Sequence, residues 1–159
     1  MRLATAAQYR HIPKKIILSD ATAYVSTADG ISINIETSQA LTFPTLSYTY
    51  FASPKIVIYF SNGLPLEITC EKMKYNHIFK DYVLEGNVLL IRGRQTLKTG
   101  FLRFDPKSSQ VSSYDRYHFR SQGIFFRGQA FHVYLKDHLL TLYGIAADKM
   151  SFKKIYLSH

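Results

Sequence analysis

The sequence predicts an all-β protein whose antiparallel sheet folds over on itself into a sandwich, a roll or an open barrel. Three observations support this expectation. A unit of about 29 residues occurs three times, apolar residues alternate within it, and the chain contains 12 Tyr and 11 Phe. Alternation with a period of two and a surplus of aromatic residues both suit pleated strands. A repeat of this length indicates paired strands stacked on copies of themselves.

The repeat is clearest in the spacing of three apolar residues around one small residue. Three copies follow one another without a gap over residues 68–154. Later in each copy, one shared position holds Gly86, Asp115 or Gly144, which are residue types common in turns. The four matched positions are Ile68, Cys70, Met73 and Tyr75 in the first copy, Leu97, Thr99, Leu102 and Phe104 in the second, and Phe126, Gly128, Phe131 and Val133 in the third.

The composition points to an anionic partner. Twenty Lys and Arg residues against 11 Asp and Glu give a formal net charge of +9. This balance favours nucleic acid, an acidic lipid head group or an anionic membrane surface as the partner. Cys70 is the one cysteine, so no disulfide framework is expected, and we interpret it as a small packed residue.

The N-terminus is expected to be a flexible or short helical lead-in over residues 1–13, so that residues 14–159 form a single β domain. No apolar run of about 18 residues occurs, and residues 1–10 lack the apolar core of a secretory signal. The protein is therefore expected either to be cytosolic or to begin after its export segment.

Strands are expected from residue 14 onward. Apolar residues occur at 16–18, 23 and 25, and after a turn at 27–30 they alternate strictly over residues 31–35. Residues 18–25 also match the spacing of the unit and suggest a degenerate fourth copy. Its distance from the first clear copy requires about 21 inserted residues, which we place around 38–54, a segment interrupted by two prolines.

Residues 55–60 form a strong strand, and Asn62-Gly63 after it predicts a tight hairpin because both residues accept positive φ. The three copies then follow as a meander of strands of six to nine residues. Residues 146–159 allow either a helical turn or a last strand. Turns are expected at residues 76–80, 92–94, 105–109, 121–123 and 136–138.

The alternation places one set of apolar side chains on a common face. No long amphipathic helix is available to cover that face, so the sheet must cover itself. The two halves then enclose either an apolar groove or a dry core, and periodicity alone favours the dry core. The set comprises Ile56, Ile58, Phe60, Ile68, Met73, Tyr75, Leu84, Val88, Leu90, Leu102, Phe104, Phe119, Phe126, Phe131, Val133, Leu140 and Leu142.

The sequence contains no arrangement typical of an active site. The six His residues show no metal-ligand spacing. His132 and His138 flank an expected turn and allow a metal pair, but we favour their interpretation as solvated loop residues. Glu67 and Glu71 lie four apart in a strand, which is a weak pattern for acid–base chemistry, and no phosphate-binding glycine loop occurs. We therefore expect no enzyme, no cofactor and no metal.

A basic and aromatic stretch over residues 114–120, continued by 125–127, allows a nucleic-acid interpretation. Aromatic rings can stack on bases while arginines contact phosphates. Tyr117 and Phe119 fall on the inward face, which leaves the basic residues between them as a solvated edge and disfavours nucleic acid. A further hypothesis is a scaffold or coat protein that assembles through the edges of its sheet.

An ordered series of strand motifs resembles the LptC family, which belongs to lipopolysaccharide export together with LptA and OstA-like domains. The resemblance covers about residues 45–146. The series consists of a strand over 52–60 that begins at Ala52-Ser53-Pro54, the Asn62-Gly63 turn, a strand over 68–75 ending in Met73-Lys74-Tyr75, the motif Leu84-Glu85-Gly86-Asn87-Val88, and the segments 97–105, 112–117 and 123–128.

This resemblance implies a β-jellyroll with an apolar groove for the acyl chains of lipid A. It implies that lipopolysaccharide passes from an inner-membrane ABC transporter of the LptBFG type, along a periplasmic bridge, to the outer membrane. An LptA-like protein would form the bridge by edge-to-edge β-augmentation. The positive charge suits phosphates and acidic sugars. The membrane helix usual in LptC-like proteins is absent from this sequence, so the resemblance implies a periplasmic protein with or without an inner-membrane anchor in a segment outside it. The extra material before Ser38, with its possible fourth copy, also makes the chain similar to the soluble, multi-copy LptA type.

The groove residues expected on this basis are Ile58, Phe60, Met73, Tyr75, Leu84, Val88, Leu90, Leu102, Phe104, Phe119, Phe126, Phe131, Val133 and Leu142.

Overall fold

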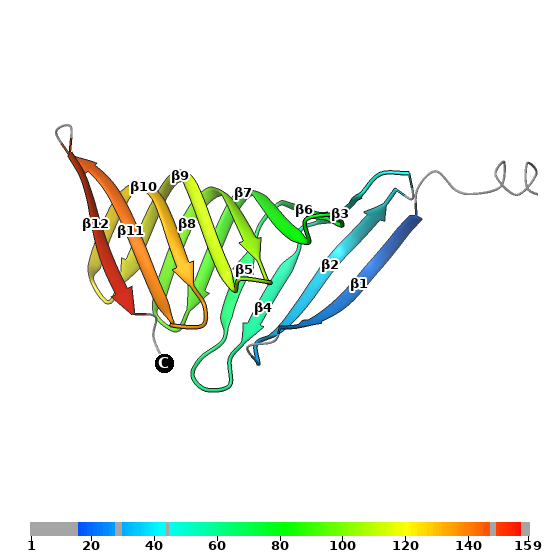
Figure 1. The fold of residues 1–159 in the computed structure, drawn as a ribbon, viewed down its shortest axis with the longest axis horizontal. Coiled ribbons are helices and arrows are strands. Elements are labelled where there is room, and N and C mark those ends of the chain that lie inside the picture. Colours follow the sequence, from blue (N-terminus) through cyan, green and yellow to red (C-terminus); the bar gives the residue numbers. More distant parts are fainter. Residues whose placement is uncertain (1–15, 28–29, 44, 147–148, 157–159) are drawn as a thin grey trace, which may run out of the picture.

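The computed structural model describes residues 16–27, 30–43, 45–146 and 149–156, which form one antiparallel sheet of twelve strands. The predicted lead-in over residues 1–13 lies outside these ranges. The strands follow one another across the molecule in chain order (Figure 1). They are β1 (Ile16–Ser26), β2 (Ser32–Thr42), β3 (Tyr48–Ala52), β4 (Lys55–Tyr59), β5 (Leu66–Thr69), β6 (Lys72–Asn76), β7 (Asp81–Arg92), β8 (Gln95–Asp105), β9 (Gln110–Ser121), β10 (Ile124–Tyr134), β11 (Leu139–Ala146) and β12 (Lys149–Tyr156).

The strand pairing is a meander of long strands, two of which are interrupted. One half of β2 pairs with β4 and the other half with β3. In the same way, β7 pairs with both β5 and β6. The chain segments β3–β4 and β5–β6 are therefore each two halves of one strand. Within the described residues the ladder runs from an edge at β1 to an edge at β12.

A line of irregular positions, here called the spine, crosses the sheet near the middle of the strands. The hydrogen-bond register shifts between Glu85 and Val88 and again between Gln129 and Phe131. Bulges of this kind bend the strand that carries them and increase its local twist. The sheet therefore turns back on itself along this line into two halves. Residues with positive φ on the spine are Asp20, Ser53, Gly86, Asn87 and Ala130.

Hydroxyl groups bind the backbone where the spine interrupts the ladder. The Thr37 hydroxyl donates to the Ala52 carbonyl at 2.7 Å, and the Thr99 hydroxyl donates to the Arg116 carbonyl at 2.8 Å. Ser113 likewise donates to a backbone carbonyl, at 2.6 Å. Backbone carbonyls that lose their ladder partner need another donor, and the buried side chains of Thr37, Thr99 and Ser113 provide it. The three side chains thus stabilise the bend.

The small residue of each repeat lies on the spine. Cys70 is buried there, and burial raises the pKa of its thiol to about 11, which confirms its interpretation as a packed small residue. At Gly128, an added Cβ would collide with the Tyr143 carbonyl and the Tyr117 hydroxyl, which are hydrogen-bonded to each other at 2.9 Å. The bend brings neighbouring strands too close for a larger side chain at this position.

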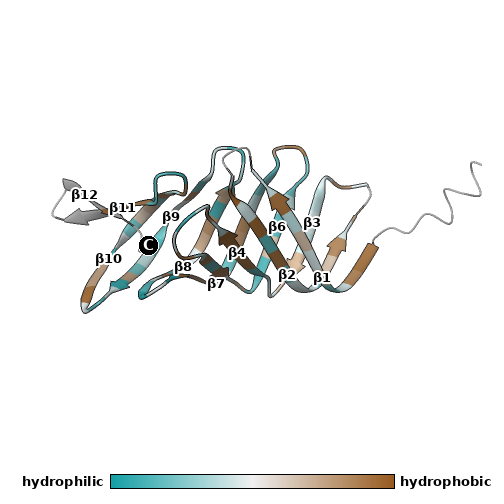
Figure 2. Cartoon of the chain, turned by 90° about the horizontal axis from the view of Figure 1, so that it is seen from below, coloured by the Kyte–Doolittle hydropathy of each residue, from teal (hydrophilic) through white to brown (hydrophobic). Residues whose placement is uncertain are grey.

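The predicted common face is confirmed as the core. All seventeen of its residues belong to one buried apolar cluster or pack against it. Hydrophobic and hydrophilic residues alternate along the strands, as Figure 2 shows. Burying each large side chain contributes about 1.5–3 kcal/mol, so this face is the main source of stability. The all-β roll predicted from the sequence is the observed fold.

The five turns predicted for the repeats lie between consecutive strands, but the strand lengths are wrong. Strands β7 to β10 contain 11 or 12 residues rather than six to nine. The reason is that Gly86 and Asp115 lie inside β7 and β9 at the spine, where the strand bends and continues. For residues 146–159, the strand alternative is correct as far as β12, and residues 157–159 lie outside the described ranges.

The predicted organisation of the N-terminal third needs three corrections. β1 runs antiparallel to β5, β8 and β10, so it does not begin a fourth copy. The supposed insertion at 38–54 contains the end of β2 and all of β3, because Pro54 lies at the spine between β3 and β4. The Asn62-Gly63 hairpin is a six-residue loop over 60–65 in which only Gly63 has positive φ.

In the turn at 27–30, Gly30 has positive φ, while residues 28–29 lie outside the described ranges.

A test of the spine is the substitution Thr99→Val, which keeps the shape of the side chain but removes its hydrogen bond to Arg116. Because this partly buried hydrogen bond would be lost, we expect the free energy of unfolding to fall by about 0.5–1.5 kcal/mol in urea titrations. The control is Thr96→Val on the same strand, where the side chain is partly exposed. Equal stabilities of the two variants would contradict the role of the hydroxyl.

Candidate binding groove

The two halves of the sheet meet again on the side opposite the spine, here called the mouth. Arg92 ends β7 in one half, and its Nη1 lies 2.7 Å from Nδ1 of His138, in the β10–β11 turn of the other half. The ring of Phe60 lies 4.8 Å from the His138 ring. Phe60, Arg92 and His138 therefore form a contact across the mouth, here called the latch.

A row of aromatic rings leads from the interior to a second part of the mouth. Tyr75 and Tyr82 have ring centroids 4.5 Å apart, and Tyr82 stacks on Phe104 at 5.7 Å. The row ends at a hollow of about 430 Å³. Val25, Ser26 and Thr27 line one side of this hollow, and Tyr75, Lys80, Tyr82, Pro106 and Lys107 line the other.

This hollow is large enough for a ligand, as are two hollows on the outer surface, but it alone adjoins the row of aromatic rings. Its volume of about 430 Å³ falls in the usual range for small-molecule pockets, roughly 300–1,000 Å³. Burial raises the pKa of Tyr82 to about 12, and the neighbouring Tyr75 contributes in the same direction. Val25 and the two tyrosines give the hollow an apolar floor, while Lys80 and Lys107 are exposed cations at its rim.

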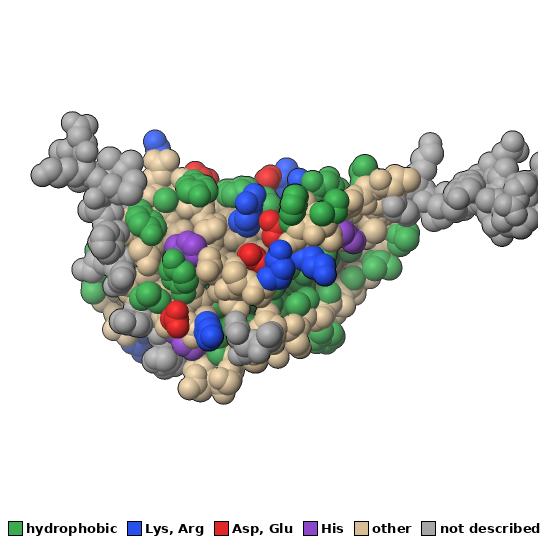
Figure 3. Space-filling model, in the orientation of Figure 1, with side chains coloured by type: hydrophobic (Ala, Val, Ile, Leu, Met, Phe, Trp, Pro, Cys, Tyr) green, Lys and Arg blue, Asp and Glu red, His purple; other side chains and the backbone are tan. Residues whose placement is uncertain are grey.

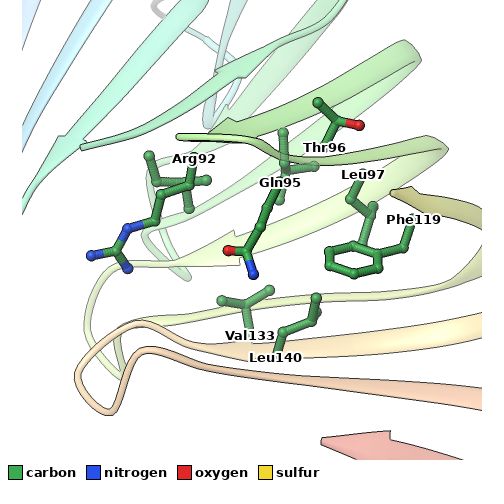
Figure 4. Close-up of a pocket in the computed structure, with 9 residues that line it drawn as sticks. Arg92, Gln95, Thr96, Leu97, Phe119, Val133 and Leu140 are labelled. Carbon is green, nitrogen blue, oxygen red and sulfur yellow. The ribbon is translucent and has the colours of Figure 1, made fainter. Parts of the chain in front are cut away.

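The interior behind the latch is packed more closely. A cavity of about 20 Å³ lies there, between walls from both halves of the sheet. Arg92 and Gln95 lie on one wall, with Val133 and Leu140 on the facing one (Figure 4). This is the space of about one water molecule, so an acyl chain fits behind the latch only if the two walls separate.

The fourteen residues predicted for the groove all face the interior. Eleven are buried, while Phe60, Tyr75 and Phe126 are partly exposed and pack against the core. Tyr75 lines the large hollow and Phe60 belongs to the latch. The structure thus brings these residues onto one surface that connects the packed interior with the mouth. Their contact with a lipid remains a prediction.

Sequence reasoning missed several residues of the mouth. His138 is partly buried against Arg92 and is not a solvated loop residue as expected. The sequence analysis places Arg92 in a turn, although it follows Leu84, Val88 and Leu90 on the inward side of β7. That alternation is the signal that could have identified it. The approach of β1 to Tyr82, by contrast, depends on the folding of the whole sheet and has no local signal.

The basic stretch around β9 lies on the outer surface. Tyr117 and Phe119 are buried, as predicted, while Arg116, His118 and Arg120 are exposed. His118 and Arg120 line a separate hollow on the outer surface. On the face drawn in Figure 3, Lys and Arg side chains lie among acidic and apolar ones. No part of this stretch contributes a cation to the mouth.

The ionisation of Tyr82 provides a test of the aromatic row. The pKa of Tyr82 is about 12 in the folded state and near 10 in the unfolded state, so unfolding releases a proton between these values. Burial of the neutral phenol therefore makes its full contribution to the free energy of unfolding below pH 10. This contribution decreases as the pH rises toward 12, by on the order of 2 kcal/mol.

The measurement is the free energy of unfolding in urea at pH 9.5 and 11.5, for the wild type, Tyr82→Phe and Tyr114→Phe. Tyr114 is 85% exposed and provides the matched control. Tyr82→Phe should lose less stability with pH than the other two proteins. If all three lose the same amount, Tyr82 is not buried as described.

Comparison with known proteins connects this fold to a function. The family model described as lipopolysaccharide-assembly, LptC-related, matches residues 4–146. The match begins well before residue 45, where the sequence resemblance was expected to start, so it includes β1 and β2. No curated protein matches the chain.

The LptC family consists of periplasmic transport and binding proteins that are anchored in the inner membrane. In the part of the chain that the structure describes, no helix has the length and apolar character needed to cross a membrane. The match covers most of the chain, and the β-jellyroll predicted from the resemblance is present. The chain therefore belongs to the LptC-related family of lipopolysaccharide assembly.

Proposed function

We propose that the protein binds the lipid A acyl chains of lipopolysaccharide between the two halves of its sheet and passes the lipid on without catalysis or a cofactor. The observation that carries this proposal is the single bent sheet, whose apolar inner face is continuous and reaches the mouth. Removing acyl chains from water onto such a face is favourable in proportion to the apolar area buried.

The hollow beside β1 is the entry point that the geometry supports best. It is already open, and its apolar floor continues through Tyr82 and Phe104 into the core. Lys80 and Lys107 at its rim suit an acidic head group that stays in water while the chains enter. Further chains require the walls to separate at the mouth, with the spine as the line about which they move.

The edges of the sheet suggest how the lipid is handed on. Among the described residues, β1 pairs only with β2, and β12 pairs only with β11. Each edge can therefore add a strand from another jellyroll by β-augmentation. An LptA-like bridge protein at one edge and an LptBFG-type transporter at the other would extend the apolar face from one protein to the next across the periplasm.

The alternative functions receive less support. A nucleic-acid site would use the outer face of β9, which is separate from the apolar interior that dominates the fold. A scaffold protein would use the same sheet edges as the bridge but would need no mouth. Membership of a lipopolysaccharide-assembly family favours transport over both.

The test of this function is a charge placed in the hollow. Phe104 is fully buried, so Phe104→Glu would bury an unpaired carboxylate and threaten folding. Tyr75 is only partly buried, so Tyr75→Glu is the better variant. We expect it to lower the affinity for lipid A at least tenfold in native mass spectrometry, because acyl chains would desolvate the carboxylate.

The matched control is Tyr114→Glu on the outer face, which should bind lipid A as the wild type does. Circular dichroism establishes that both variants keep their β content. Undiminished lipid capture by folded Tyr75→Glu would remove the hollow from the binding path. If the wild type captures no lipid A at all, the proposed function is wrong.

A further inference from the structure

Arg92 is unusual among the cations of this protein because it is buried. Only 1% of its surface is exposed, and it is the one charged side chain among the buried polar residues that the structure describes. It lies at the end of β7 on the inner face, after Val88 and Leu90. A buried cation is costly unless other groups compensate its charge.

The contacts of Arg92 compensate that charge incompletely. Nη1 lies 2.7 Å from Nδ1 of His138, and the guanidinium stands 4.5 Å from the centre of the Phe60 ring. An arginine can only donate, so Nδ1 of His138 accepts and carries no proton in this contact. The three ion pairs of the described residues, which join Lys55, Lys72 and Arg103 to carboxylates, lie elsewhere. Among the described residues, the groups in contact with Arg92 are therefore neutral, and none of them is an anion.

The unused donors of Arg92 lie on one edge of its guanidinium. Nε and Nη2 are buried and have no hydrogen-bond partner in the part of the chain that the structure describes. These two nitrogens point their hydrogens in the same direction, as the fork that binds both oxygens of a phosphate or carboxylate. Leaving two charged donors unsatisfied in an apolar interior destabilises the protein. Two parallel donors without partners on a buried guanidinium are typical of a binding site for an anionic ligand.

The surroundings of Arg92 indicate what kind of anion would reach it. The side chain lines the small cavity behind the latch, whose other walls include Leu90, Val133 and Leu140 (Figure 4). A free inorganic ion would gain nothing from these apolar walls. An amphiphile would use both parts, since its chains contact the walls while its anionic group meets the guanidinium at the mouth.

We propose that the Nε and Nη2 edge of Arg92 binds a phosphate group of the lipid whose acyl chains lie between the halves of the sheet. This inference rests on the proposed function and assigns a second anion-binding group at the mouth, apart from Lys80 and Lys107. As the mouth opens, the phosphate of the bound lipid becomes the anionic partner of Arg92. The positive charge of Arg92, which has no anionic partner in the closed protein, therefore stabilises the complex with the lipid. Phosphate accepts both hydrogen bonds of the fork at once.

The experiment compares lipid A with the same lipid after removal of its phosphates. Affinities are measured by native mass spectrometry for the wild type, Arg92→Gln and Arg94→Gln. Arg94 lies two residues away and is exposed, so its variant removes the same charge from the surface. The wild type should prefer phosphorylated lipid A by about tenfold to a hundredfold, the range expected for charged hydrogen bonds.

Arg92→Gln should reduce this preference at least tenfold while still binding the dephosphorylated lipid, and Arg94→Gln should leave the preference unchanged. An equal preference in the wild type and in folded Arg92→Gln overturns the inference. Equal affinity of the wild type for the two lipids also overturns it and leaves acyl-chain binding intact. Binding of neither lipid by the wild type overturns the proposed function and this inference together.

A second variant covers the case in which Arg92→Gln does not fold. Arg92→Lys keeps the positive charge but has no planar fork, because an ammonium group acts as a point charge. It should lose most of the preference for phosphorylated lipid A. A full wild-type preference in Arg92→Lys would show that charge alone is sufficient and would overturn the role of the fork.

Discussion

The structure depends on the bend that lets one sheet cover its own apolar face. The described chain provides no helix to shield that face, and a flat sheet of this composition would expose it to water. Bulges, positive φ values and the small residues Cys70, Thr99 and Gly128 make the bend possible at one line across the strands. The mouth follows from this geometry, because the two halves of a sheet folded along one line meet again on the opposite side, where side chains such as those of the latch join them.

Much of the fold could be predicted from the sequence, because burial of one face imposes an alternation that a repeat makes visible. The predicted strand length of six to nine residues was wrong. Gly86-Asn87 has the composition of a turn, but here it adopts positive φ in the middle of the continuous strand β7. A bend inside a strand and a turn between strands need the same residue types. Only the pairing of β7 with β8, which continues on both sides of the spine, distinguishes them.

The candidate site was predictable only in its apolar part. Inward residues such as Phe104 and Phe131 follow from alternation alone, and they are buried as expected. The latch joins Arg92 to His138, which lies 46 residues later, and no periodic pattern connects the two. A charged residue at an inward position is an exception to the pattern, and such exceptions are where function is expected. Arg92 is that exception in this protein.

The central claim is that the two halves of the sheet separate at the mouth to receive a lipid. The most direct measurement is the distance between spin labels on Arg94→Cys and Lys136→Cys, which stand on facing turns at the mouth, in a Cys70→Thr background. Pulsed electron paramagnetic resonance would record this distance with and without lipid A. The account predicts a longer distance in the loaded protein. An unchanged distance in protein shown by mass spectrometry to carry lipid A would contradict it.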